Sequence, residues 1–239
     1  MINIHCTKRE AALWHALLDL AERETRWVLI GARMVELHAL QAGRALSRAS
    51  PDGDALADAR ARPNPVRRMA QLLVDQGFEL IDFAVLGTGH TFRKGDIEID
   101  VLAPEHLGAN SEDARTTVPP LHTVEVPGGR QAIDRGEWVE IEVNGRRGRL
   151  PRPGLLGAIL IKARAVDIDD TPETQRQDLA LLLSLVDDPE TLMASLHGTE
   201  RGWLKARAEM NSEDAGCWIG MSQANVIRGL AAVRILGGL

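Results

Sequence analysis

The sequence predicts an α/β (α+β) protein, in which helices flank a mixed sheet and a helical bundle follows at the C-terminal end. Two observations support this fold class. Up to about residue 103, stretches with helical spacing of apolar residues alternate with short apolar runs that end at turn residues. Beyond Pro153, helical spacing continues without strand-like runs. We therefore expect an α/β domain over residues 1–152 and a helical domain over residues 153–239.

The first elements follow from apolar spacing and one glycine. Apolar residues recur at helical intervals over residues 8–24, which predicts an amphipathic helix. The apolar run at residues 27–30 is too short for another helix and indicates a buried strand. Gly31 then marks a sharp turn into a second helix through Met34 and Leu37.

A third helix has clear signals at both ends. Asn64 is a favoured N-cap, Pro65 suits the first helical position, and Gly77 suits the residue that follows the last turn. Residues 78–85 and 97–102 predict strands, the second of them preceded by a turn. Strands and helices thus alternate along this part of the chain.

Between residues 104 and 153 the signals are those of turns and one hairpin. The dipeptide Asn144-Gly145 separates two strand-like runs, residues 138–143 and 146–150, and predicts a β-hairpin. The rest of the chain predicts helices, and the patterns lie around residues 155–160, around residues 179–186, from Pro189 and from Ser222.

Composition narrows the function classes. A chain of 239 residues with 44% hydrophobic residues can bury a sizeable core. A net charge of −6 argues against nucleic-acid binding driven by overall charge, but 28 Lys and Arg residues still allow a local basic patch for RNA. Cys6 and Cys217 lie far apart and predict neither a disulfide framework nor a zinc site. No apolar stretch approaches the ~20 residues of a membrane span, so we expect a cytoplasmic protein without a membrane partner.

Three acidic residues form the candidate site. If Asp52 and Asp54 lie on an extended strand, alternation puts both carboxylates on one face, with their Cα atoms roughly 7 Å apart. Asp100, on the later predicted strand, would complete the group. Carboxylate oxygens suit Mg²⁺ and leave coordination positions for a triphosphate. The pattern therefore predicts metal-assisted phosphoryl chemistry, with these three residues as metal ligands and catalytic acids.

Plainer interpretations of the same residues stay open. Asp52 and Asp54 are residue types of an exposed turn, and Asp100 would also suit the solvated face of a half-buried strand. We prefer the metal site because Gly31 and Arg48 precede the acidic pair in the order that such a site needs.

A known family shares this order of elements and residues. A strand, a Gly-containing turn and a helix precede the pattern Arg-x-Ser-x-Asp-x-Asp at residues 48–54, and a later strand contains Asp100. This arrangement resembles the nucleotidyltransferase superfamily. More narrowly, Lys162 and the tripeptide Arg176-Gln177-Asp178 resemble the AbiE-type (AbiEii-like) toxin nucleotidyltransferases of bacterial toxin–antitoxin systems. The resemblance covers roughly residues 27–185.

The resemblance implies a Mg²⁺-dependent enzyme that transfers a nucleotide from an NTP to an acceptor hydroxyl. In the toxin branch the acceptor is often the tRNA 3′ end, and an antitoxin protein is the expected partner. Asp52 and Asp54 would hold the metal, and Asp100 would also orient the acceptor hydroxyl. The residues that the resemblance assigns to the nucleotide are Gly31, Ala32, Arg48, Ser50, Lys162 and Asp178, with Asp178 orienting Lys162 or the nucleotide.

Two departures from the family pattern keep other functions open. Ala32 offers no hydroxyl to a phosphate, and Gly53 replaces the usual apolar residue between the two acids. They motivate a second hypothesis, a catalytically degenerate nucleotidyltransferase-like protein that acts by binding. A third hypothesis is an antibiotic-modifying nucleotidyltransferase, which would need an acidic acceptor cleft for a polycationic drug.

Overall fold

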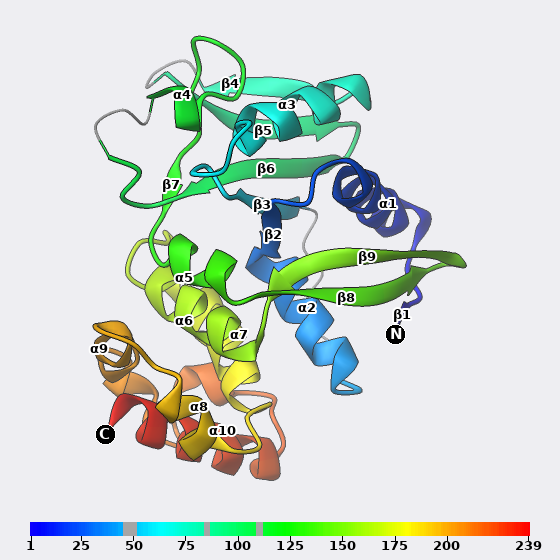
Figure 1. Cartoon of the computed structure of the whole chain (residues 1–239). Coiled ribbons are helices and arrows are strands. Elements are labelled where there is room, and N and C mark those ends of the chain that lie inside the picture. Colours follow the sequence, from blue (N-terminus) through cyan, green and yellow to red (C-terminus); the bar gives the residue numbers. More distant parts are fainter. Residues whose placement is uncertain (45–51, 84–86, 109–111) are drawn as a thin grey trace.

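The larger sheet lies in the upper half of the molecule as Figure 1 shows it, and helices gather below it. The computed structural model describes residues 1–44, 52–83, 87–108 and 112–239. These residues form a mixed α/β structure with two sheets and a group of C-terminal helices (Figure 1). The predicted fold class is therefore confirmed.

Six strands of the described chain form the larger sheet, which mixes parallel and antiparallel pairs. The order across it is β2-β3-β6-β5-β4, and β7 pairs with the end of β6. β3 and β6 run parallel at its centre, whereas β2, β5 and β4 join antiparallel. The strands are β2 (Trp27–Ile30), β3 (Asp52–Ala57), β4 (Glu79–Phe83), β5 (Thr88–Lys94), β6 (Ile97–Pro104) and β7 (Glu125–Val126).

The strands predicted at residues 27–30, 78–85 and 97–102 correspond to β2, β4 and β6 and are confirmed. The prediction missed β5, whose sequence TGHTFRK is mostly polar. This strand pairs with β4 on one side and β6 on the other. Backbone hydrogen bonds to both neighbours hold it in the sheet, so it forms without the apolar pattern that would have predicted a strand.

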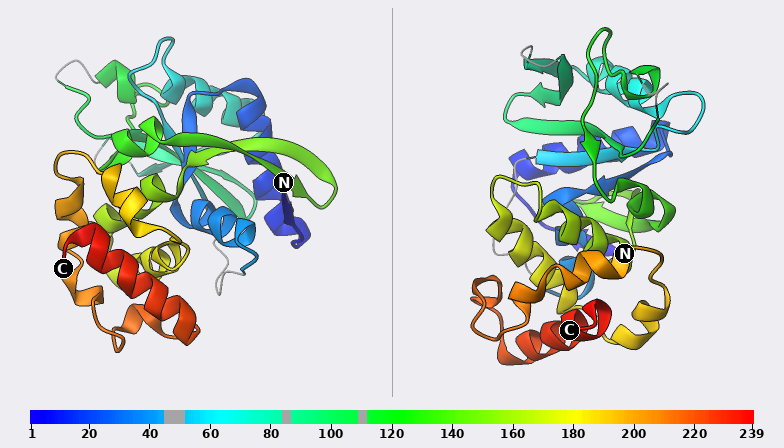
Figure 2. Two further views of the ribbon diagram at one scale, coloured as in Figure 1. Left: turned by 60° about the horizontal axis from the view of Figure 1, so that its bottom comes forward. Right: turned by 90° about the vertical axis from the view of Figure 1, so that its left-hand side faces the viewer.

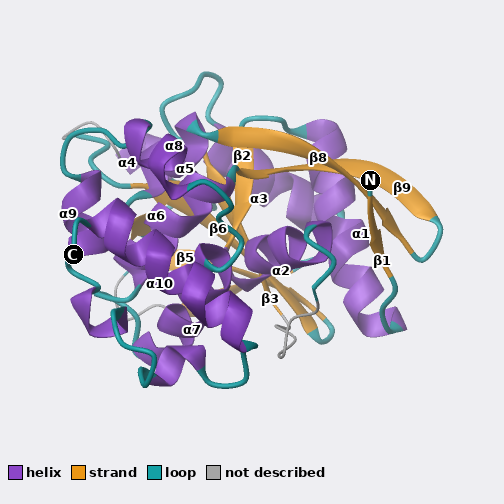
Figure 3. Cartoon of the chain, turned by 90° about the horizontal axis from the view of Figure 1, so that it is seen from below, coloured by secondary structure: helices purple, strands orange, loops and turns teal. Residues whose placement is uncertain are grey.

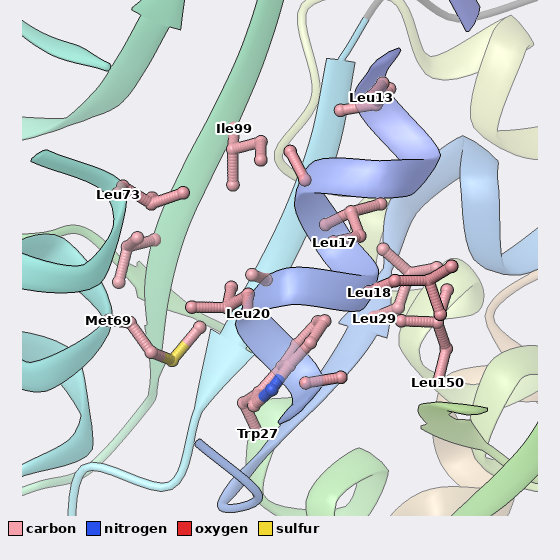
Figure 4. Packing of buried hydrophobic residues seen from close by; sticks show 14 of the residues in the cluster. Leu13, Leu17, Leu18, Leu20, Trp27, Leu29, Met69, Leu73, Ile99 and Leu150 are labelled. Carbon is pink, nitrogen blue, oxygen red and sulfur yellow. The ribbon is translucent and has the colours of Figure 1, made fainter. Parts of the chain in front are cut away.

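Helices cover both faces of the larger sheet. On one face, α1 (Lys8–Arg23) and α3 (Pro65–Asp75) enclose a core in which leucines of α1 lie over the strands (Figure 4). On the other face, α2 (Gly31–Gln41) packs together with C-terminal helices. Figure 3 shows α2 between the C-terminal helices and the α1 side of the molecule.

Local capping explains where the predicted helices begin. Thr7 and Glu10 form a reciprocal capping box at the start of α1. Asn64 accepts a hydrogen bond from the Val66 N–H, and Pro65 opens α3, as predicted. These side chains satisfy amides that have no partner inside the helix, so both helix starts are set by nearby sequence.

The smaller sheet contains the predicted hairpin and one strand that was not predicted. β8 (Gly136–Val143) and β9 (Arg146–Pro153) are joined at Asn144-Gly145, where both residues have positive φ. β1 (Ile2–Ile4) adds in parallel to β8. The Asn144 amide donates to the Cys6 carbonyl at 2.9 Å, which holds the N-terminal segment against the hairpin. β1 was not predicted because a strand of three residues is too short to show a periodic pattern of apolar residues.

The C-terminal part is helical, as predicted, and lies below the sheets (Figures 1 and 2). The predicted helix starts at Pro189 and after Ser222 are confirmed, and Asp188 and Ser222 cap those helices. None of the helices in the described ranges combines the length and apolar character that a membrane span requires. The helices are α6 (Leu155–Ala165), α7 (Pro172–Leu183), α8 (Pro189–Ala194), α9 (Glu200–Lys205) and α10 (Gln223–Gly237), with α4 (Glu112–Arg115) and α5 (Gly129–Asp134) preceding them.

These helices share a core with the sheet. The cluster on the α2 face joins Ile30 and Leu56 of the strands with Ile159 of α6, Leu183 of α7 and Val233 of α10. The division into domains at residue 152 stays a prediction, but this shared core means that the C-terminal helices form one wall over that face of the sheet.

Candidate active site

The three predicted acids lie on the two central strands of the larger sheet. Asp52 and Asp54 are on β3, and Asp100 is on β6. In the parallel register, Asp54 stands opposite Asp100 and Asp52 stands opposite Glu98. Cross-strand partners point to the same face, and residues two apart on a strand do so as well. The fold therefore gathers all three predicted acids on one face of the sheet.

That face is the one opposite α1. A Cβ on Gly53 would lie 3.3 Å from Leu13 and 3.4 Å from Leu17, so Gly53 points at α1 and its neighbours Asp52 and Asp54 point away from it. The small residue between the two acids is thus explained by helix packing on the far face. It is not a gap in the candidate site.

Burial and neighbouring negative charges raise the pKa of two of these acids. Burial raises the pKa of Asp54 to about 7, and the charges of Asp100 and Asp52 raise it further, whereas Lys162 opposes them. Burial also raises the pKa of Asp100, against a hydrogen bond from Thr91 that lowers it. A cation placed between these carboxylates would relieve the repulsion.

One carboxylate oxygen at this place lacks a hydrogen-bond partner. Oδ1 of Asp100 is buried and makes no hydrogen bond to any described residue. It is an oxygen donor of the kind that Mg²⁺ prefers, so the donor set fits the ion chemically. Within the described ranges, however, no group of three His, Cys, Asp or Glu side chains is already arranged to hold a metal ion.

Gly31 places the start of α2 against Asp54. Its φ is +66°, a left-handed conformation that L side chains rarely adopt. A Cβ at this position would lie 1.7 Å from Oδ2 of Asp54, so no larger residue fits beside that carboxylate. Ala32 follows in the first turn of α2 and is partly exposed. The amino end of the helix therefore lies directly beside the face of the sheet that carries Asp52, Asp54 and Asp100, here named the acid face.

Lys162 and Asp178 form a buried ion pair on the helical wall. Nζ of Lys162 on α6 lies 2.8 Å from Oδ2 of Asp178 on α7, and the two side chains are 5% and 3% exposed. The same ammonium donates to Oε1 of Gln175 at 2.8 Å. Because the charge of Lys162 lowers the pKa of Asp54, the pair also acts electrostatically on the acid face.

Some residues at this place were not predicted, and two predicted ones are not among the described residues. Arg48 and Ser50 fall outside the described residues. Thr91, which donates to Asp100, lies on the strand that the sequence signals missed. Gln175 donates to Asp169, whose charge also raises the pKa of Asp54. In the sequence, Gln175 and Asp169 look like ordinary polar residues of a helix and of the loop before it. Their part in the site depends on the packing of α7 against α6, which the sequence does not show.

Comparisons with known proteins gave one structural likeness. No family model matches the chain, and no curated protein matches its sequence. The fold is similar to the crystal structure of an antigenic nucleotidyltransferase-like protein from Paracoccidioides brasiliensis, with 11% sequence identity and a TM-score of 0.45. The alignment covers 95% of this chain and 87% of that one.

Proposed function

We propose that this protein is a nucleotidyltransferase, which transfers a nucleotide from an NTP to an acceptor hydroxyl with the help of Mg²⁺. The observation that carries the proposal is the register of β3 on β6, which puts Asp54 opposite Asp100. The two acids face a wall that contributes Lys162, a fixed positive charge. Acids beside a fixed cation suit a triphosphate that arrives with a metal ion.

Asp52, Asp54 and Asp100 are the residues that would hold the ion. When bound, Mg²⁺ would neutralise charge on the triphosphate and on the departing pyrophosphate. Two observations support this assignment. The pKa of Asp54 is raised to about 7, because its negative charge is buried near other acids. Oδ1 of Asp100 has no hydrogen-bond partner among the described residues, so its lone pairs can bind an ion.

The remaining residues bind and orient the reactants. Gly31 adds no side chain of its own beside the Asp54 carboxylate at the amino end of α2, where backbone N–H groups can bind a phosphate. Lys162, oriented by Asp178, offsets phosphate charge. Arg48 and Ser50 complete this set in the proposal, together with the backbone at Ala32.

The reaction follows from these positions. The acceptor oxygen forms a bond to the α-phosphorus, while the bond from that phosphorus to the oxygen bridging to the β-phosphate breaks. Pyrophosphate leaves with the electron pair of that bond. Asp100 orients the acceptor hydroxyl and takes its proton, a role that its raised pKa supports because a more basic carboxylate binds a proton more readily.

Label transfer tests the proposal. The protein is mixed with each α-labelled NTP, Mg²⁺ and total tRNA, and labelled tRNA is resolved on a gel. We expect transfer by the wild type, none by Asp54→Asn, and wild-type transfer by Asp75→Asn. Asp75 is an exposed acid at the end of α3, on the other face of the sheet. Equal transfer by Asp54→Asn and the wild type would refute the assignment.

The finer part of the proposal concerns acceptor and partner. We take the tRNA 3′ end as the acceptor and a cytoplasmic antitoxin as the partner, on the strength of the residues that resemble the toxin branch. Removing the 3′ end of the tRNA should abolish labelling. An acceptor panel that includes an aminoglycoside separates this role from antibiotic modification.

A second candidate function is nucleotide binding without transfer. The observation that favours it is that no three metal-binding side chains of the described residues are already arranged around one point. Calorimetric titration distinguishes the two functions. An enzyme should bind an NTP only with Mg²⁺, whereas a silent binding protein should show the same affinity with and without the ion.

A further inference from the structure

A cavity with polar and apolar walls lies at the C-terminal end of α2, away from the acid face. It measures about 390 Å³ and is found where α2 meets the end of β9 and the start of α6. Gln41 lies ten residues beyond Gly31, or roughly 15 Å along the helix axis at 1.5 Å per residue. Its walls include His38, Gln41, Glu137, Arg152 and Leu155.

Arg152 is the buried cation in the wall of this cavity. Its side chain is 1% exposed, and Nε and Nη2 donate to Oε1 of Glu137 at 3.2 and 3.1 Å. Nη2 also donates to the amide oxygen of Gln41. Nη1 is buried and has no acceptor among the described residues. A guanidinium does not lose its charge in a protein, so this buried donor can pair with an acceptor that a ligand supplies.

The positive charge in the cavity wall is more deeply buried than its negative partner. Arg152 is buried, whereas the side chain of its partner Glu137 is 48% exposed, so water screens the negative charge more than the positive one. Burial lowers the pKa of His38 to about 3, and the charge of Arg152 lowers it as well. His38 is therefore neutral, and its Nε2 lies 3.0 Å from the Pro153 carbonyl.

The start of α6 adds the partial positive charge of a helix amino end to the cavity wall. Leu155, the first residue of the helix, lines the cavity. The N-cap is Gly154, and no side chain described in the structure caps it. The positive end of the helix dipole therefore lies at this wall, where Oε2 of Glu137 is 3.6 Å from the position that a Cβ on Gly154 would take.

We propose that this cavity binds a phosphate-sized oxyanion, either inorganic phosphate or the phosphate group of a small molecule, with Nη1 of Arg152 as a principal donor. One oxygen accepts from Nη1, and others face the first turn of α6. Glu137 is half-exposed and competes with the ligand for the guanidinium. The cavity is larger than one phosphate, which leaves space for the rest of a phosphorylated small molecule. This proposal does not depend on the proposed enzymatic activity.

Isothermal titration of the full chain tests the site. Inorganic phosphate and glycerol 3-phosphate are titrated separately at constant ionic strength and without Mg²⁺. We expect saturable binding at one site. Arg152→Gln should weaken binding at least about tenfold, because a charge-assisted hydrogen bond is lost. Glu137→Gln should tighten it several-fold, because the competing carboxylate is removed.

Two control variants keep the result specific. Arg149 lies on the same strand and is exposed over Trp138, so Arg149→Gln removes the same charge outside the cavity and should leave binding unchanged. Asp54→Asn should also leave binding unchanged, which separates this cavity from the acid face. Tighter binding of glycerol 3-phosphate would identify a phosphorylated small molecule as the ligand class, and tighter binding of inorganic phosphate would identify the free ion.

Several outcomes would overturn the proposal. One is that neither probe binds saturably. Another is that Arg149→Gln and Arg152→Gln weaken binding equally, which would indicate general charge attraction. If Arg152→Gln does not fold, Glu137→Gln decides alone. Unchanged or weaker binding by that variant then rejects the site.

Discussion

The carboxylate of Asp54 fills the space that a side chain on Gly31 would need, with Oδ2 only 1.7 Å from the position of its Cβ. The two residues are brought together because Ile30, the last residue of β2, pairs with Asp54 of β3. The residue type at the turn into α2 is therefore restricted by the position of the Asp54 carboxylate on the neighbouring strand. A glycine is required at the turn for steric reasons as well as for its backbone conformation.

Gly31→Ala should disturb both stability and nucleotide binding. Positive φ alone costs an L residue about 1 kcal/mol, and displacing Asp54 adds on the order of 2 kcal/mol. Gly43→Ala is the matched control, because Gly43 has φ +68° and no described atom within 4 Å of its Cβ position. Urea unfolding of both variants isolates the steric part. Equal losses of stability would mean that the contact with Asp54 has no energetic weight.

Asp54→Asn should stabilise the protein at alkaline pH while abolishing transfer. The pKa of Asp54 is raised from 3.8 to about 7 in the folded chain, so the folded state holds its proton more tightly than the unfolded state. The associated stability is complete below pH 3.8 and is lost as the pH rises through 7. At pH 8 without Mg²⁺, the variant should be more stable by roughly 2–4 kcal/mol.

Unfolding free energies at pH 4 and pH 8 check this expectation. The gain from Asp54→Asn should grow between the two pH values, whereas Asp75→Asn should show no such trend. A variant that is less stable than the wild type at pH 8 would contradict the description of Asp54 as an uncompensated carboxylate.

His38 should make the fold sensitive to acid. Burial, aided by the charge of Arg152, lowers its pKa from 6.5 to about 3, so the unfolded chain takes up a proton before the folded chain does. The stability is complete above pH 6.5 and falls as the pH drops toward 3. The loss by pH 5 should be about 2 kcal/mol. His38→Gln keeps a donor for Pro153 and should flatten this slope.

Unfolding midpoints between pH 5 and pH 8 measure the effect of His38. His5→Gln removes an exposed histidine and serves as the control. If His38→Gln and His5→Gln show the same slope, another group accounts for the acid sensitivity.

The Lys162–Asp178 pair should be separable into a structural and a functional contribution. Lys162→Met leaves Asp178 buried without its ammonium partner and should cost about 3–5 kcal/mol. The double variant Lys162→Met/Asp178→Leu should recover much of that stability, because two apolar side chains can fill the same place. It should still fail to transfer a nucleotide, since the charge of Lys162 no longer offsets the phosphates.

Thermal unfolding and label transfer, measured on the same preparations, check both parts. A double variant that is stable and fully active would show that Lys162 serves the fold alone. A double variant as unstable as Lys162→Met would show that the pair is needed for packing in a way that apolar residues cannot replace.

Short-range features of this protein could be predicted from the sequence. The start of α3 at Asn64 and Pro65 and the hairpin at Asn144-Gly145 were predicted correctly, because each depends on the backbone preferences and local hydrogen bonds of adjacent residues. The same holds for Asp52 and Asp54 on one face, which follows from the two-residue period of a strand.

The partners of these elements were decided by tertiary structure. Pairing of Asp54 with Asp100 joins strands that are far apart in the chain, and β1 reaches β8 across more than half of it. Gly53 illustrates the difference, because it stands between two site residues in the sequence but serves the packing of α1 on the other face. Arg152 lies near the predicted domain boundary, and only the folded chain shows that its buried side chain lines a cavity between α2 and α6. A single sequence carries the local backbone preferences, whereas the choice of partner depends on which distant surfaces bury each other, and only the folded chain shows that.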